Sequence, residues 1–286
     1  MHKILKKQQL NSDICLLEFE ALDIAKAARP GQFVILRVDE KGERFPLTIY
    51  DFDKGKGTVT VVCQAVGVST KKLCALNKGD CIQDIAGPLG HPLQSEKIGK
   101  VICIGGGVGT AEAYPIAKAY LSAGRQDKEA CNDVTVIVGS RTKEFLICEE
   151  ELKQAGLKVL VATDDGSYGR KGFVTDILKE LLSKDKYDLV YAIGPIVMMK
   201  AVSNMTLAYK IKTLVSLNSI MIDGTGMCGG CRIRYNTQSK FTCVDGPEFD
   251  GLLVDFDELI KRQGRFVDKE KQALEHYNCK IGLNKK

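Results

Sequence analysis

The chain has 286 residues, of which 44% are hydrophobic, and a formal net charge of +5. It is long enough for two or three domains with their own cores. It contains no run of about 18 apolar residues and no signal-peptide core, and its lysines are scattered without interleaved aromatic residues. We therefore expect a soluble cytoplasmic protein with no membrane partner and no nucleic-acid partner.

Residues 1–97 are predicted to form an all-β domain. Short apolar runs at 14–19, 33–38 and 58–66 alternate with turns rich in glycine and proline. Strands at this spacing favour a small barrel or sandwich.

Two motifs in this domain have groups that suit a phosphorylated cofactor. The first motif contains an arginine that can pair with a pyrophosphate and a threonine hydroxyl for a ring nitrogen or carbonyl; its residues are Arg44, Pro46, Leu47 and Thr48. The second motif, Gly67, Ser69 and Thr70, precedes the helix-like run 71–76, where N–H groups and hydroxyls can meet phosphate. Each motif also has an ordinary alternative, a strand start for the first and a helix N-cap for the second.

Residues 98–215 change to alternating strands and helices. Strands are predicted at 101–104, 134–138, 158–162 and 189–193, and helices at 111–123, 174–182 and 197–208. Alternation of this kind predicts a Rossmann-like parallel sheet with helices on its faces.

A glycine-rich turn follows the first of these strands and opens a helix, which is the context of a dinucleotide site. Its residues are Gly105, Gly106, Gly107, Val108, Gly109 and Thr110. Ser140 and Arg141 end the next strand, where such a pair can contact an adenosine 2′-phosphate, so NAD and NADP both stay open. Asp164, Gly194 and Pro195 end later strands, where ligands of α/β proteins bind, although ordinary loops are an equal alternative.

Four residues in the segment 216–250 have the spacing of a metal-ligand set. Asp223, Cys228, Cys231 and Cys243 are separated by four, two and eleven residues. Plant-type [2Fe–2S] proteins use C-x₄-C-x₂-C…C, so the pattern fits with aspartate in the first position. The alternatives are a zinc loop and a reactive cysteine pair, and structural zinc sites favour cysteine and histidine over aspartate.

The remaining cysteines and the tail carry less information. The chain has 11 cysteines, and an odd number without a secretory signal argues against a disulfide framework. Cys63 and Cys103 lie in apolar runs and are expected to be core residues. Residues 251–286 form a C-terminal extension with one predicted helix at 256–262.

Together and in this order, the motifs resemble the ferredoxin–NADP⁺ reductase superfamily. They are most similar to its iron–sulfur branch, which includes the electron-transfer subunits of dihydroorotate dehydrogenase. The runs 215–231 and 243–250 look like those of the small subunits of NADH-dependent reduced ferredoxin:NADP⁺ oxidoreductases, also described as sulfide dehydrogenase beta subunits. The dihydroorotate branch has cysteine where this chain has Asp223, so the aspartate separates the two groups.

The resemblance covers about residues 1–265 and implies three functional units. They are an FAD-binding β-barrel at 1–97, an NAD(P)-binding α/β domain at 98–215 and a [2Fe–2S] loop at 216–250, which the extension at 251–286 follows. FAD would lie around the motifs at 44–48 and 67–70, and NAD(H) over 105–110, Asp164 and 194–195, with NADP(H) not excluded.

The expected activity is a flavin relay in which NADH reduces FAD and single electrons pass to the [2Fe–2S] cluster. No catalytic side chain is predicted, because the cofactors carry the chemistry. The resemblance also implies a larger FAD/[4Fe–4S] partner subunit in a heterodimer or higher complex, with ferredoxin reached through that complex in electron bifurcation. The alternatives are an electron-transfer subunit of dihydroorotate dehydrogenase or of a sulfide/polysulfide reductase and, from another class, a zinc-bound binding module.

Overall fold

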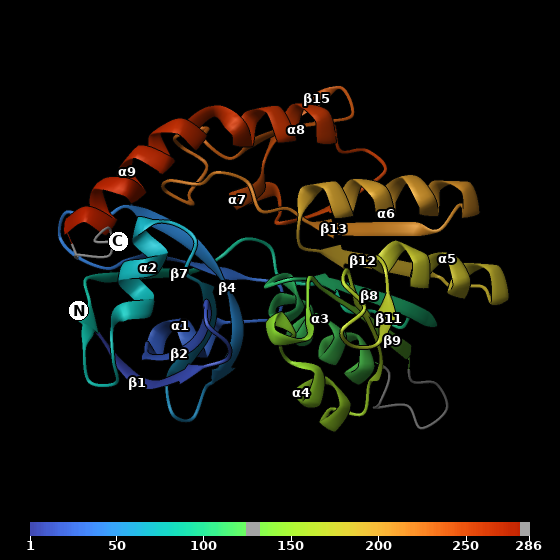
Figure 1. The fold of residues 1–286 in the computed structure, drawn as a ribbon, viewed down its shortest axis with the longest axis horizontal. Coiled ribbons are helices and arrows are strands. Elements are labelled where there is room, and N and C mark those ends of the chain that lie inside the picture. The colour runs from blue at the N-terminus through green and yellow to red at the C-terminus, as the bar shows by residue number, and fades with distance from the viewer. Residues whose placement is uncertain (124–131, 281–286) are drawn as a thin grey trace.

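The structure is a computed structural model that describes residues 1–123 and 132–280. Figure 1 shows a β-domain at the N-terminus, an α/β domain beside it, and a C-terminal segment that extends over both. Among the residues described, no helix is long and apolar enough to cross a membrane.

The N-terminal domain is a seven-stranded antiparallel sheet in the order β6-β1-β2-β5-β4-β3-β7. Two short helices accompany it, α1 (Leu22–Ala27) and α2 (Val68–Ala75). The sheet is nearly closed, so the predicted barrel is confirmed. Its strands are β1 (His2–Gln9), β2 (Ile14–Glu20), β3 (Phe33–Arg37), β4 (Arg44–Asp53), β5 (Thr58–Gln64), β6 (Cys81–Ile82) and β7 (Asp84–Leu89).

Side chains of β3 alternate between two apolar environments, as the period of a strand requires. Val34 and Leu36 face the barrel core, whereas Phe33 and Ile35 belong to a separate cluster on the outer face. That outer cluster also contains Cys231 and other residues of the C-terminal loop. A strand buried on both faces explains the continuous apolar run in the sequence.

The second domain is a mainly parallel sheet in the order β11-β10-β9-β8-β12-β13-β16, in which β16 pairs antiparallel with β13. Its strands are β8 (Lys100–Gly106), β9 (Asp133–Ser140), β10 (Lys158–Thr163), β11 (Arg170–Lys171), β12 (Leu189–Ile193), β13 (Lys212–Ser216) and β16 (Glu248–Asp250). The predicted parallel α/β domain is confirmed. The chain returns across β8 to form β12, so the loops after these two adjacent strands flank a topological switch point.

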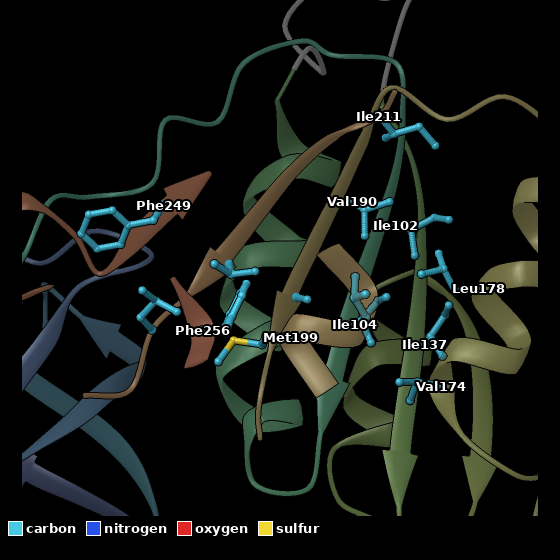
Figure 2. Close-up of a cluster of buried hydrophobic side chains, with 14 of the residues drawn as sticks. Ile102, Ile104, Ile137, Val174, Leu178, Val190, Met199, Ile211, Phe249 and Phe256 are labelled. Atoms are coloured by element: carbon cyan, nitrogen blue, oxygen red, sulfur yellow. The ribbon is translucent and has the colours of Figure 1, made fainter. Parts of the chain in front are cut away.

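Helices cover both faces of this sheet. α3 (Gly109–Ser122) and α4 (Glu149–Gln154) bury Ile116 and Leu152 on the side of Val101. α5 (Val174–Lys184) and α6 (Ile196–Tyr209) bury Leu178 and Met199 on the opposite side, where Figure 2 shows them among the strand side chains. A short 3₁₀ turn, η1 (Lys143–Phe145), lies between β9 and α4.

The C-terminal segment is more regular than the sequence indicates. It contains a hairpin of β14 (Arg232–Tyr235) and β15 (Gln238–Phe241), then α7 (Thr242–Asp245), α8 (Phe256–Gln263), η2 (Gly264–Phe266) and α9 (Val267–Lys280). The predicted helix at 256–262 is α8. α9 was not predicted, because it has no buried residue and therefore no apolar stripe in its sequence. β16 lies inside the predicted loop segment 216–250 but pairs with the α/β sheet, and the domain boundaries themselves stay predictions.

Candidate functional site

The first cofactor motif lies on β4, beside the outer face of β3. Thr48 pairs with Phe33 and Pro46 with Ile35 across the two strands, so all four residues share the outer face. Leu47 points the other way and packs on the barrel core, which leaves only its backbone for a ligand on the outer face. Arg44 is exposed at the start of the strand.

The Thr48 hydroxyl joins the two domains. It donates a hydrogen bond to Oε2 of Glu112, in the first turn of α3, over 3.0 Å. Two residues further on in each element, the rings of Tyr50 and Tyr114 stack with centroids 5.0 Å apart. Burial raises the pKa of Glu112 to about 7, against the opposing effect of the Thr48 hydrogen bond. Sequence inspection missed Glu112, since a glutamate in a first helical turn is ordinary.

The second motif begins α2. The Thr70 hydroxyl accepts hydrogen bonds from the N–H groups of Val66 and Gly67, at 3.1 and 3.0 Å, so it caps the helix as the alternative predicted. Ser69 donates to Oε2 of Glu43 over 2.9 Å. A Cβ built on Gly67 would meet no atom within 4 Å, so the space beside its Cα is open to an approaching group, although its N–H already donates to Thr70. Phosphate binding here stays a prediction.

The glycine-rich turn is closely packed against the loop after β12. A Cβ on Gly109 would lie 2.6 Å from the carbonyl oxygen of Ile193, and one on Gly194 would lie 2.8 Å from that of Gly106. Pro195 contacts the same turn, since a Cβ on Gly106 would lie 3.0 Å from its ring. The predicted residues of these two loops are therefore brought together.

The same turn also has the features of a ligand cradle. Gly107 has a φ of +57° and open space at its Cβ position, so the backbone there is exposed to a ligand. Val108 is the partly buried N-cap residue of α3. The Thr110 hydroxyl is buried and has no hydrogen-bond partner in the described part of the chain. Open glycine backbone at a helix N-terminus fits the pyrophosphate of a dinucleotide.

The ends of β9 and β10 form a polar loop pair beside the cradle. Ser140 donates to the carbonyl of Thr142 over 2.9 Å and accepts a backbone hydrogen bond from Asp164 N over 3.1 Å. Arg141 and Asp164 are exposed. The Thr142 hydroxyl is shielded and lacks a partner within the described residues, a feature that sequence inspection missed. Contacts of these side chains with a nucleotide stay predictions.

The cluster loop brings two of the four predicted ligands together directly. The sulfurs of Cys231 and Cys243 are buried and 3.2 Å apart. Burial, together with the Cys231 thiol, raises the pKa of Cys243 to about 12, so a metal would have to replace its proton. Asp223 accepts hydrogen bonds from the N–H groups of Thr225 and Cys228, both at 2.9 Å, and these donors hold the pKa of its carboxyl below the usual range.

Cys228 is exposed, and its sulfur accepts the Gly230 N–H at 3.4 Å. In residues 1–123 and 132–280, the structure closes no group of three or more histidine, cysteine or acidic side chains around a metal position. The donor set is nevertheless suited to iron: two adjacent sulfurs, a third thiol and a carboxylate on one glycine-rich loop. The assignment of the four ligands stays a prediction.

The loop is seated on the outer face of the barrel. Gly224 has a φ of +74°, and a Cβ there would lie 2.9 Å from atoms of both Ile35 and Leu89. Cys231 and Cys243 share their apolar cluster with Phe33, the strand partner of Thr48. The cluster loop, the cofactor motif on β4 and the start of α3 therefore converge on one part of the barrel surface, as Figure 1 shows from the positions of α3, β4 and α7.

Two cysteines outside the loop lie in the core, as the sequence predicts. Cys63 and Cys103 are fully buried in the barrel and in the α/β sheet. The structure contains no disulfide among the ten described cysteines; Cys131 lies outside the described residues.

Family models match the cluster loop and the α/β domain. Residues 218–255 match the iron–sulfur cluster binding domain of dihydroorotate dehydrogenase B, and residues 103–204 match an oxidoreductase NAD-binding domain. The first match favours an iron–sulfur cluster over a zinc ion as the group bound by this loop.

Relatives cover nearly the whole chain. A Thermotoga maritima protein described as a dihydroorotate dehydrogenase B (NAD(+)) electron transfer subunit homolog is 44% identical over 277 residues, which is 97% of this chain and 95% of that protein. The electron transfer subunit of dihydroorotate dehydrogenase B from Shouchella clausii is 34% identical over 257 residues, 86% of this chain and 94% of that protein.

A solved structure of NADH-dependent reduced ferredoxin-NADP oxidoreductase, described in connection with flavin-based electron bifurcation, contains a chain with a TM-score of 0.89 and 44% identity. The match covers 97% of this chain and 98% of that chain. An Amycolatopsis cytochrome P450 reductase, at 21% identity and a TM-score of 0.61, shares the fold. The chain therefore belongs to the iron–sulfur branch of the ferredoxin–NADP⁺ reductase superfamily, the family of oxidoreductase electron-transfer subunits similar to those of dihydroorotate dehydrogenase B and of NADH-dependent reduced ferredoxin:NADP⁺ oxidoreductase.

Proposed function

We propose that this chain is the NADH-reactive electron-transfer subunit of a flavin-based bifurcating complex of the ferredoxin:NADP⁺ oxidoreductase type. The observation that carries the proposal is the convergence at Thr48. The outer face of β3 and β4 meets the dinucleotide-binding helix through Glu112 and the cluster loop through Phe33. A two-electron donor site and a one-electron acceptor site thus flank the same surface.

The residues of that surface fit a flavin. Thr48 supplies a hydroxyl, Pro46 and Ile35 supply apolar contact, and the open space beside Gly67 lies before the N-terminus of α2. A bound flavin accepts electrons in pairs and releases them singly, which neither a nicotinamide nor an iron–sulfur cluster does alone.

The protein groups position the cofactors and hold a proton. The cradle around Gly107 would bind the dinucleotide phosphates, with the Thr110 hydroxyl as a further donor. The carboxyl of Glu112, whose pKa burial raises to about 7, accepts a hydrogen bond from the hydroxyl of Thr48, so this carboxyl can exchange a proton near neutral pH with a group bound on that face. The close packing between the two loops buries Gly109.

The cluster loop would pass electrons outward. Asp223, Cys228, Cys231 and Cys243 would hold the [2Fe–2S] cluster, and the exposed side chain of Met227 lies next to Cys228 on the solvent side. A larger partner with its own FAD and [4Fe–4S] clusters would dock there and pass electrons to ferredoxin. Relatives that are named as subunits of complexes support a partner of this kind.

An absorption and EPR spectrum of the purified chain tests the proposal. Flavin bands with [2Fe–2S] shoulders, bleached by NADH, are expected, with one FAD and one cluster per chain. A colourless protein that contains stoichiometric zinc contradicts it. Purification of the native complex with its cofactors counted then tests the partner.

The second candidate is an electron-transfer subunit of dihydroorotate dehydrogenase. The names of several relatives favour it, and Asp223 argues against it. The purified complex distinguishes the two: reduction of NADP⁺ by NADH together with reduced ferredoxin supports the first, and reduction of NAD⁺ by dihydroorotate supports the second.

A further inference from the structure

Arg262 is a buried charge without an acidic partner. It lies on α8 with a side chain that is 9% exposed, and its Nη2 donates a hydrogen bond to the carbonyl of Gly230 over 3.3 Å. In the described residues, no carboxylate oxygen lies within 4 Å of its guanidinium. Removing a charge from water is unfavourable unless an opposite charge compensates it.

The surroundings of Arg262 are themselves positive. Arg232 and Arg265 line the same cavity of about 100 Å³, together with the apolar side chains of Ile220 and Ile222. Burial and the two neighbouring arginines lower the pKa of Arg262. The positive charge of Arg262 is therefore only weakly compensated by negative groups nearby. Glu258, one turn earlier on α8, opposes this effect from beyond ion-pair distance.

Gly230 lies between two predicted cluster ligands. Cys228 precedes it by two residues, and Cys231 follows it directly. Leu259 anchors α8 in the apolar core against Ile233 of β14, the strand that continues from Cys231. The guanidinium of Arg262 is therefore fixed against the ligand loop, and a cluster bound through thiolates, carboxylate and sulfide brings negative charge to this place.

We propose that Arg262 compensates the negative charge of the iron–sulfur cluster and raises its reduction potential, an inference that rests on the proposed cluster in this loop. Reduction adds one negative charge to the cluster. A fixed positive charge therefore stabilises the reduced state more than the oxidised state, and the low dielectric of a buried site strengthens the effect. Arg262 acts through the electric field and the loop backbone, so it is a positioning residue.

The test is an EPR-monitored redox titration of the full chain loaded with its cluster. Arg262→Gln is expected to lower the reduction equilibrium constant about tenfold, which is a downward shift of about 59 mV for one electron. Arg262→Lys keeps the charge and is expected to stay nearer the wild-type potential. Arg265→Gln removes the same charge from an exposed position, where solvent screens it, and is expected to shift the potential much less.

Glu258→Gln keeps the measurement informative if Arg262→Gln loses its cluster. Asp255 caps the backbone N–H of residue 258 over 2.9 Å, so the helix end is retained. Removing this negative charge is expected to raise the potential. An unchanged potential in loaded Arg262→Gln, an equal shift in Arg265→Gln or no rise in Glu258→Gln overturns the inference. A wild-type chain without a [2Fe–2S] EPR signal instead overturns the proposed function.

Discussion

Glu248 is a partly buried carboxyl group whose charge should set how stability depends on pH. It lies on β16 and accepts a hydrogen bond from the Tyr191 hydroxyl over 2.8 Å. It also approaches the barrel, since a Cβ on Gly31 would lie 3.2 Å from its Oε1. Burial raises the pKa of Glu248 from 4.5 to about 7, and the Tyr191 hydrogen bond opposes part of the rise.

Proton linkage gives the direction in which the free energy of unfolding changes with pH. The folded protein binds the proton of Glu248 more tightly than the unfolded chain does, so the free energy of unfolding falls as the pH rises from 4.5 through about 7. Each pKa unit corresponds to about 1.4 kcal/mol, so charging Glu248 lowers stability by at most about 3.5 kcal/mol. The stabilising contribution is fully present below pH 4.5.

Glu248→Gln removes the charge and keeps an oxygen acceptor for Tyr191. We expect the variant to match the wild type at pH 5 and to exceed it at pH 8. At roughly 2–4 °C per kcal/mol, the gain in Tm approaches about 10 °C. The assay is thermal unfolding of the cofactor-loaded protein across this pH range, followed by circular dichroism.

Two further variants separate the effect of the Glu248 charge from the effects of other carboxylates. Glu270→Gln, which removes one carboxylate at an exposed position of α9, is the matched control. Tyr191→Phe removes the hydrogen bond that lowers the pKa of Glu248 and should steepen the loss of stability with pH. A difference between wild type and Glu248→Gln that is the same at pH 5 and pH 8 would refute the reasoning.

Three further predictions concern the cofactor surface. Glu112→Gln keeps an acceptor for Thr48 but has no titrating carboxyl. The rate of flavin reduction by NADH, followed by stopped-flow absorbance, should therefore lose its inflection near pH 7. An unchanged inflection contradicts a role for Glu112 in proton exchange. Gly109→Ala places a Cβ 2.6 Å from a backbone oxygen, so it should lower stability by about 1–3 kcal/mol and weaken NADH binding in calorimetry, whereas Gly264→Ala, in open space, should do neither. Asp223→Ala should change the EPR signal and potential of the cluster, and Asp223→Asn should separate ligation from the loss of the two backbone hydrogen bonds; unchanged spectra in both variants exclude Asp223 as a ligand.

Local patterns in the sequence determined the architecture. The glycine-rich turn at 105–110 can be recognised from the strand before it and the helix after it. The ligand spacing of the cluster loop can likewise be read from one short segment of the sequence. The barrel strands, the parallel sheet and α8 follow from apolar periodicity over short windows. The family resemblance rests on the same short motifs, and the whole-chain relatives confirm it.

Tertiary structure alone decided which distant groups meet. Thr48 and Glu112 are 64 residues apart, Tyr191 and Glu248 57, and Gly230 and Arg262 32. Such pairs arise from packing between elements, whose geometry no local period encodes. α9 was missed for a related reason, because a helix with no buried face carries no apolar stripe to read. The sequence thus determined the modules, and the fold decided the polar contacts that couple them.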